Sequence, residues 1–427
     1  MHLIVYTTKY RTGGDKFPRI AATRANELRA KGKDVLCEAI ESKKDLKAIF
    51  HRLKDKGKSI DSFHFIGHSG MHGPMYGTME FPEQFSPYEW KQLEIPFAEN
   101  AEAYFLCCRS ARWFANFFAN TFNVLTYGYH WYTSFSSSPK QFKADKGGNS
   151  PLYAIGCVGK KSHGYIGSIK KYLGTEAEEL KQFKPGDNAD TSYDKVAELY
   201  DAVFQDIKVR EDEWAWLDQH IPHNPEQTII DIGCGNGALL KELSSRMKKG
   251  IGLDRSISIL QQAEKMNQHN PHIEFKQITS PILPLEDASV DIAISMLSFR
   301  YLDWDPLMNE LKRVLKPGGK FLVVDMVAVP AKLKHYLSLL NSKFKHYKHR
   351  KKYPDYYTAL QKLVKHPDWQ TMLKYNPIRA EHEMLWYLES RFESRKVEKI
   401  NIGYHSSVLA FDTGDFHKIN ALELSYP

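Results

Sequence analysis

The chain has 427 residues, which is longer than one typical domain, and its hydrophobic share of 42% and charged share of 26% put a well-packed core within reach. Its formal net charge of +8 permits an acidic partner or nucleic acid but does not demand one. The N-terminal apolar run is too short for a signal peptide and no stretch approaches the roughly 18 apolar residues that span a bilayer, so we expect a cytoplasmic protein.

The first 170 residues alternate between strand and helix patterns. We expect strands at 2–8, 34–40, 62–70, 101–108 and 123–129, and helices at 19–32, 43–57 and 111–122. This alternation predicts a mostly parallel sheet that is covered on both faces. In such sheets the functional groups gather at the carboxyl ends of the strands.

A change in composition separates the two halves of the chain. Residues 133–150 are a polar loop rich in Ser, Lys and Gly, and 175–191 are polar and contain a Pro-Gly pair. Such composition is typical of a linker. We therefore expect a first domain at 1–174, a linker at 175–191 and a second domain at 192–427.

The second domain begins another alternating series. Two helices, at 192–207 and 211–221, precede strands at 228–233, 250–254, 273–278, 290–297 and 320–326, with helices at 238–247, 256–268 and 305–315 between them. A helical insertion at 331–394 interrupts the series. Residues 396–405 and 407–413 then predict a terminal antiparallel hairpin.

The strongest motif is a glycine-rich turn between a strand and a helix, in the segment TIIDIGCGNGALL. The strand ends at Asp231, and Gly233, Gly235 and Gly237 form the turn. Glycines allow a ligand to approach the backbone closely there. A dinucleotide fingerprint would need a third glycine where Leu240 stands, so an NAD or FAD site is not favoured.

The turn resembles the first motif of class I S-adenosylmethionine-dependent methyltransferases, D-x-G-x-G-x-G. Three further stretches match that family in order and spacing: GIGLD, which ends at Asp254, the loop and strand at 282–295, and the helix, Pro-Gly-Gly turn and strand at 308–326. The resemblance covers roughly 190–330 and 395–415. It implies a Rossmann-like seven-stranded sheet with S-adenosylmethionine as the cofactor.

The resemblance also implies which residues bind the cofactor. The backbone of the glycine turn would hold the methionyl and ribose parts, and Asp254 would accept from the ribose. The main chain of Thr279–Ile282 would flank the adenine, and Ser295 and Met296 would face the reactive centre. The implied cofactor-binding residues are Asp231, Gly233, Gly235, Gly237, Asp254, Thr279, Ser280, Ser295 and Met296.

The methyl acceptor is not identified by any motif, so we expect transfer by proximity to an oxygen or nitrogen of a small molecule, peptide or protein. His346, His349 or His382 would serve as the base. Residues 343–352 hold six lysines and arginines among aromatic residues, which indicates either an acidic or RNA partner or a solvated helix face.

The first domain presents a possible nucleophile. One apolar strand ends at His68, and a second leads into YFLCCRSA. This pattern resembles the caspase-like cysteine peptidases, and it implies Cys108 as the nucleophile, His68 as the base and Cys107 as a buried neighbour. The amides of Gly70 and Cys108 would form an oxyanion hole.

Several functions therefore stay open. The chain is a methyltransferase, a caspase-like cysteine peptidase with a regulatory methyltransferase domain, or a methyltransferase that binds RNA. The caspase-like α/β domain is itself a peptidase, a fold retained for binding, or an unrelated α/β domain. The five cysteines are odd in number and lack metal-type spacing, so we expect reduced thiols and no metal site.

Overall fold

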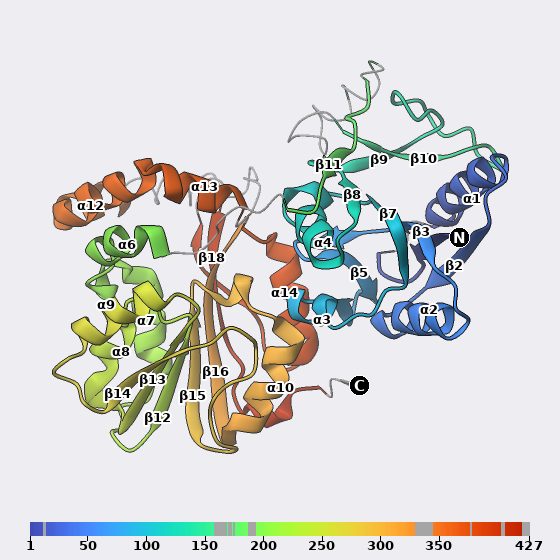
Figure 1. Ribbon diagram of the computed structural model, residues 1–427. Helices are drawn as coiled ribbons and strands as arrows, with labels where there is room; N and C mark the ends of the chain where they lie inside the picture. The colour runs from blue at the N-terminus through green and yellow to red at the C-terminus, as the bar shows by residue number, and fades with distance from the viewer. Residues whose placement is uncertain are drawn as a thin grey trace. The chain divides into compact units, whose positions relative to one another are not determined.

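The computed structural model describes residues 1–11, 14–157, 169, 173, 176–186, 194–328, 345–375, 378–402 and 406–420. The chain forms two compact units, Met1–Asn188 and Ala189–Pro427 (Figure 1). Each unit is built on its own sheet, so each is described by itself.

The first unit contains a six-stranded sheet in the order β11-β8-β7-β3-β1-β2, parallel except for β11. Its strands are β1 (His2–Thr7), β2 (Val35–Ile40), β3 (Ile60–Ile66), β7 (Phe97–Leu106), β8 (Leu125–Gly128) and β11 (Lys181–Phe183). Its helices are α1 (Lys16–Arg29), α2 (Lys43–Asp55), α3 (Pro87–Lys91) and α4 (Phe114–Phe122). The expected parallel sheet of the first half is therefore present.

Helices cover both faces of this sheet, because apolar side chains alternate along its strands and point to each face in turn. Leu3 and Phe63 pack against α2, α3 and α4, whereas Ile4 and Ile66 pack against α1. Because successive strand residues point to opposite faces, one apolar strand serves two cores. Both faces of the strands are buried for this reason.

The structure adds short strands that the sequence analysis did not predict. Residues 69–84 form a three-stranded antiparallel sheet of β4 (Ser69–Gly70), β5 (Gly73–Gly77) and β6 (Pro82–Gln84). The expected polar loop begins with β9 (Thr133–Ser136), which pairs with β10 (Tyr153–Gly156). Residues 181–183, expected in the linker, instead form the edge strand β11.

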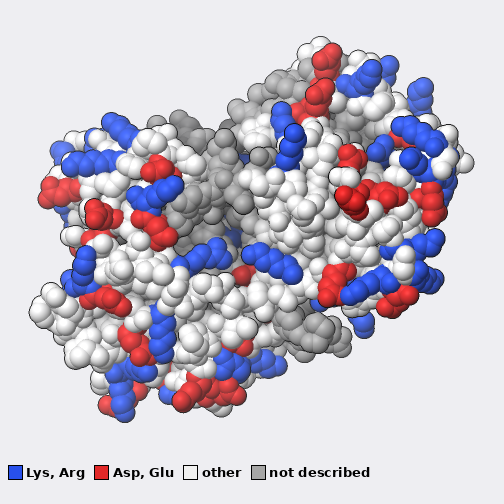
Figure 2. Space-filling view, viewed as in Figure 1, with Lys and Arg blue, Asp and Glu red and all other residues white. Residues whose placement is uncertain are grey.

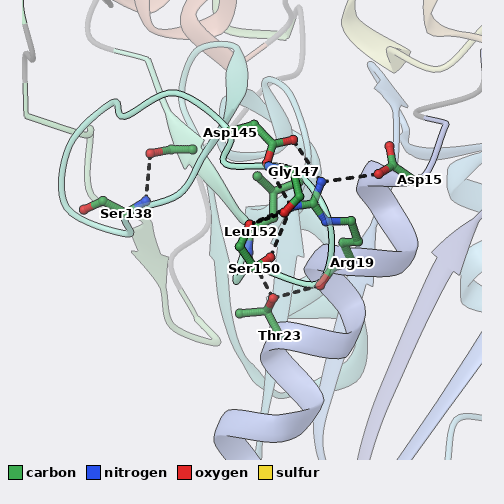
Figure 3. Close-up of polar contacts among 9 residues, drawn as sticks. Asp15, Arg19, Thr23, Ser138, Asp145, Gly147, Ser150 and Leu152 are labelled. Carbon is green, nitrogen blue, oxygen red and sulfur yellow. Dashed lines mark hydrogen bonds and ion pairs between the residues drawn. The ribbon is translucent and has the colours of Figure 1, made fainter.

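The loop between β9 and β10 is fastened to α1 by Arg19 (Figure 3). The guanidinium donates to both carboxylate oxygens of Asp145, at 2.8 and 2.9 Å, and to the carbonyl and hydroxyl of Ser150. The hydroxyl of Thr23, one turn further along α1, accepts from the amide of Leu152 at 3.1 Å. Side-chain hydrogen bonds from α1 thus fix the loop between β9 and β10, which has no apolar periodicity of its own.

The second unit contains a seven-stranded sheet in the order β14-β13-β12-β15-β16-β18-β17, parallel except for β18, which runs antiparallel to both of its neighbours. Its strands are β12 (Thr228–Ile232), β13 (Lys249–Asp254), β14 (Ile273–Gln277), β15 (Val290–Met296), β16 (Leu315–Ala328), β17 (Glu398–Ile402) and β18 (Ser406–Asp412). The expected Rossmann-like sheet and its terminal hairpin are confirmed.

Helices cover both faces of this sheet (Figure 1). They are α6 (Ala197–Val203), α7 (Glu211–His220), α8 (Ala238–Leu243), α9 (Ile257–Met266), α10 (Trp304–Val314), α12 (Pro354–Lys365), α13 (Pro367–Tyr375) and α14 (Glu381–Arg391). One core joins α10 and α14 to the sheet, and a second joins α7 and α8 to the opposite face. The expected helix at 192–207 is shorter, since α6 ends where Phe204 turns into a separate apolar cluster.

Candidate functional site

The glycine turn after β12 is held in place by the end of the neighbouring strand β13. The amide of Gly233 donates to the carbonyl of Leu253 at 2.7 Å, and the amide of Gly235 donates to the Asp254 carboxylate at 3.0 Å. Gly233 and Gly235 have φ values of +78° and +54°, which favour glycine. A Cβ on Gly233 would lie 2.3 Å from the hydroxyl oxygen of Ser298, so a side chain has no room there.

Two carboxylates stand at this edge of the sheet. Asp231 is only 3% exposed, and among the described residues its Oδ1 has no hydrogen-bond partner. Burial, together with the negative charge of Asp254, raises the pKa of Asp231 to about 8. Burial also raises the pKa of Asp254, although amide donors such as Ser256 and Gly235 favour its charged form. A cationic ligand beside this pair would favour the ionised form of Asp231.

The two residues expected at the reactive centre end β15. Ser295 is fully buried and its hydroxyl donates to the carbonyl of Ile232 at 3.1 Å. Its hydroxyl therefore braces the strand before the glycine turn. Met296 is 9% exposed and belongs to an apolar core. Ser298, which the sequence analysis did not single out, donates to the same carbonyl at 2.8 Å and lies against the turn.

The expected adenine loop lies beside Asp254. The amide of Ile278 donates to the carbonyl of Asp254 at 2.9 Å, and Thr279 and Ser280 follow directly. Two isoleucines near this loop are unusually open: Ile282 is 57% exposed, and Ile257, at the start of α9, is 53% exposed. A flat apolar ligand group would cover such side chains. Ile257 was missed because a single apolar residue at a helix start carries no periodic signal.

A second group that the sequence analysis missed comes from α6. The Tyr200 ring lies 3.3–3.4 Å from where a Cβ on Gly235 would stand. The Asn236 amide donates to the carboxylate of Asp201 at 2.9 Å and to the carbonyl of Phe204 at 3.1 Å. Burial raises the pKa of Tyr200 to about 12, and Asp231 and Asp254 are among the charges that act on it. Helix α6 thus lies over the glycine turn.

In the first unit, parallel strands bring the two ends of the expected dyad to one edge of the sheet. Ile66 of β3 pairs with Leu106 of β7, so His68 and Cys108 each lie two residues beyond a paired position. The Cys108 sulfur accepts from the amide of Thr133 at 3.3 Å and lies 3.2 Å from its hydroxyl. The Nε2 of His68 donates to the carbonyl of Arg11 at 2.7 Å. Cys107 is fully buried.

The basic segment of the insertion forms the helical residues 345–352, while Lys343 lies outside the described residues. Two of its lysines pair with acids of α7: Lys352 with Glu211 at 2.6 Å and Lys345 with Asp212 at 3.5 Å. On the face shown in Figure 2, basic side chains are interspersed with acidic ones.

The three candidate bases in the insertion already have neighbours. His349 donates through Nε2 to the carbonyl of Val209 at 2.7 Å, and its Nδ1 lies 3.0 Å from the Tyr357 hydroxyl. His346 contacts the same hydroxyl at 3.3 Å, and the ring of His382 lies 4.7 Å from that of Trp386. None of these contacts selects one histidine as the base.

Two searches concern the described part of the chain as a whole. No helix within it is long and apolar enough to cross a membrane. Within the same residues, no group of three or more His, Cys, Asp or Glu side chains is arranged to hold a metal ion.

Comparisons with known proteins agree with the glycine turn and its surroundings. Residues 230–323 match a family model described as a methyltransferase domain. A malonyl-[acyl-carrier protein] O-methyltransferase of Marinomonas is 30% identical over 38% of this chain and 57% of its own length. An uncharacterized methyltransferase of Schizosaccharomyces pombe is 29% identical over 26% and 43%. The chain spans about half the length of these curated relatives.

Solved structures that resemble part of the chain include the following two. A methyltransferase of Aquifex aeolicus has 18% identity and a TM-score of 0.33, covering 53% of this chain and 100% of that one. A complex between the Haloferax volcanii Trm112 methyltransferase activator and a putative methyltransferase has 27% identity and a TM-score of 0.29, covering 32% of this chain and 62% of that one.

The residues at the turn fit S-adenosylmethionine. This cofactor carries a cationic sulfonium and an ammonium group, and Asp231 presents a buried carboxylate oxygen with no partner in the described part of the chain. The positive φ values of Gly233 and Gly235 form the tight turn at which the backbone of such a site approaches the ligand. Residues 230–323 of the second unit thus match a methyltransferase domain, and the residues at the turn fit S-adenosylmethionine as the cofactor.

Proposed function

We propose that the chain transfers a methyl group from S-adenosylmethionine to an oxygen or nitrogen nucleophile of a small molecule, peptide or protein. The observation that carries this proposal is the buried carboxylate oxygen of Asp231, which has no hydrogen-bond partner among the described residues and lies next to the glycine turn. When bound, the cofactor supplies a methyl group already activated on a sulfonium, so the protein has to align the acceptor and exclude water.

The residues of the site divide this work. The backbone of the glycine turn receives the methionyl and ribose parts, Asp254 accepts from the ribose hydroxyls, and Asp231 attracts the cationic end. The loop at 279–282 and Ile257 flank the adenine. The buried hydroxyl of Ser295 and the contacts of Met296 fix the end of β15, which faces the acceptor.

A titration tests this assignment. S-adenosylhomocysteine should bind the wild-type chain with a measurable heat, and Asp254→Ala should weaken binding roughly 10- to 150-fold, which corresponds to one charge-assisted hydrogen bond. Asp291→Ala is the matched control, because Asp291 lies at the amino end of β15 and binds the amide of Thr228. Absence of heat with the wild type, or equal binding by Asp254→Ala, would remove the proposal.

We propose a cysteine peptidase in the first unit as a second candidate, supported by the register that aligns Ile66 with Leu106. Cys108 would attack a peptide carbonyl, and His68 would take the thiol proton. Iodoacetamide should then alkylate Cys108 in the folded chain, whereas Cys107 should react only after unfolding. Equal protection of both cysteines in the folded chain would exclude the peptidase.

An acidic or RNA partner is the third proposal, and it rests on the exposed residues Lys348, Arg350 and Lys351 with the exposed ring of Tyr347. Charge reversal of Arg350 and Lys351 to Glu should weaken binding of a single-stranded RNA and flatten its dependence on salt. Unchanged RNA retention would count against this surface.

A further inference from the structure

The helical insertion rests on α6. Val203 and Phe204, at the end of α6, share a buried apolar cluster with Leu363 of α12, and the ring of Tyr356 lies 6.3 Å from that of Phe204. Trp369 of α13 packs against the same cluster. The segment 354–372 therefore has an apolar anchor at α6.

Polar contacts fasten the preceding helix in the same place. The Nε2 of His349 donates to the carbonyl of Val209 at 2.7 Å, and both Lys352 and the Tyr353 hydroxyl contact the carboxylate of Glu211, at 2.6 and 3.2 Å. These partners all lie in the segment that follows α6. Residues 349–353 are thus packed against residues 209–211, about 140 positions earlier in the sequence.

The other side of α6 belongs to the cofactor site. Tyr200 stands over Gly235, and Asp201 accepts from Asn236 within the glycine turn. Just before α6, Asp194 accepts from the hydroxyl of Ser256 at 2.5 Å, and Ser256 caps α9 immediately after Asp254. One short helix therefore touches the turn on one side and carries the insertion on the other.

We propose that α6 couples cofactor binding to the insertion. This inference rests on the proposed function of the glycine turn. A cofactor in the turn contacts Tyr200 and holds α6 in place, and a fixed α6 presents Val203 and Phe204 as the seat of α12. Tyr200 and Leu363 are then positioning residues, and α12 is held more firmly against α6 when the cofactor is present.

Hydrogen exchange of the full chain, with and without saturating S-adenosylhomocysteine, tests the coupling. We expect slower exchange in 231–237, in 197–204 and in 354–372. Slower exchange in the glycine turn with unchanged exchange in 354–372 would overturn the coupling and leave the proposed function intact. Failure of S-adenosylhomocysteine to bind would overturn both.

A pair of neighbouring variants sharpens this test. Leu363 is fully buried against α6, whereas Val364 is 45% exposed on the same helix. Leu363→Ala should remove the protection of 354–372 and weaken S-adenosylhomocysteine about fivefold or more, since coupling between two sites is reciprocal. Val364→Ala should change neither. Identical behaviour of the two variants would refute the coupling, and if Leu363→Ala does not fold, the wild-type exchange decides.

Discussion

Gly233 offers the sharpest test of how the cofactor turn is built. Its φ is +78°, and an added methyl group would lie 2.3 Å from Oγ and 2.4 Å from Cβ of Ser298. Ser298 does not move away freely, because its hydroxyl donates to the carbonyl of Ile232 at 2.8 Å. Gly233→Ala therefore has to strain the backbone and displace Ser298 together.

The expected cost follows from these two terms. A non-glycine residue in the left-handed region costs roughly 1–2 kcal/mol. Displacing Ser298 loses a hydrogen bond worth about 1 kcal/mol and disturbs its packing. A sum of about 3 kcal/mol corresponds to a fall of roughly 6–12 °C in Tm for a unit of this size. If the same cost of about 3 kcal/mol falls on the cofactor-bound form of the turn alone, the affinity for S-adenosylhomocysteine falls roughly 100-fold.

Two comparisons separate the terms. Gly318 has a φ of +80°, and a Cβ there meets no atom of the described chain within 4 Å, so Gly318→Ala measures the backbone strain alone. In Gly233→Ala with Ser298→Gly, the nearest remaining atom of residue 298 is its Cα, at 3.9 Å. That double variant should recover part of the loss of Gly233→Ala.

The assay is thermal unfolding and titration of S-adenosylhomocysteine. It is applied to Gly233→Ala, Gly318→Ala, Ser298→Gly and the double variant of Gly233→Ala with Ser298→Gly. A cost of Gly233→Ala that equals the cost of Gly318→Ala would refute the steric argument. Strict additivity of Gly233→Ala and Ser298→Gly would refute it as well, since contacting residues should show a coupling energy.

Three other outcomes are expected. Asp231 holds its proton up to about pH 8 in the folded state and only to about pH 4 when unfolded, so its contribution to stability falls as pH rises between these values. Affinity for S-adenosylmethionine, which is cationic, should rise over the upper part of that window and become flat in Asp231→Asn; a flat wild-type profile, measured by calorimetry, would contradict this. Arg19→Ala should speed hydrogen exchange in 137–150, because it removes every contact of that guanidinium with Asp145 and Ser150; unchanged exchange would show that the loop is held otherwise. Asp325→Ala should cost roughly 3–5 kcal/mol in urea denaturation, because it leaves Arg300 buried without its carboxylate. The exposed pair of Lys396 with Glu389 should be worth under about 1 kcal/mol, and equal costs for the two pairs would refute the burial argument.

The second unit was the more predictable of the two. The run of strands from Thr228 to Asp412 has strong apolar patterns, and the turn at Gly233 is a local motif in which chemistry and spacing coincide. A local signal is enough when one short segment both shapes the backbone and binds the ligand. The seven-stranded sheet was expected from the family resemblance, and the terminal hairpin was expected from the apolar patterns of its two strands as well.

The missed residues act through contacts between distant segments. Tyr200 precedes Gly235 by 35 positions and meets it only because α6 folds over the turn. Ser298 lies just past the carboxyl end of β15 and contacts Gly233, which is 65 positions earlier in the sequence. No local sequence pattern around Tyr200 or Ser298 predicts these contacts.

The first unit was harder to read in its short elements. β4, β5 and β6 span 69–84, where glycine and proline are frequent and apolar alternation is absent. β11 has three residues in a polar segment and is defined by its pairing with β8. Strands of this length have too few residues to show a periodic apolar pattern. Their extended conformation depends on pairing with a neighbouring strand, which the local sequence does not predict.

The position of β18 has a consequence for synthesis of the chain. β16 is fourteen residues long, and it acquires its second neighbour only from Ser406–Asp412, about 80 residues after it ends. Until the ribosome has released that segment, one border of β16 has unpaired amide and carbonyl groups beside apolar side chains. Such a border recruits other strands. A nascent or truncated chain that stops before residue 398 is therefore a hazard for self-association, and the last strands are the ones that close the sheet.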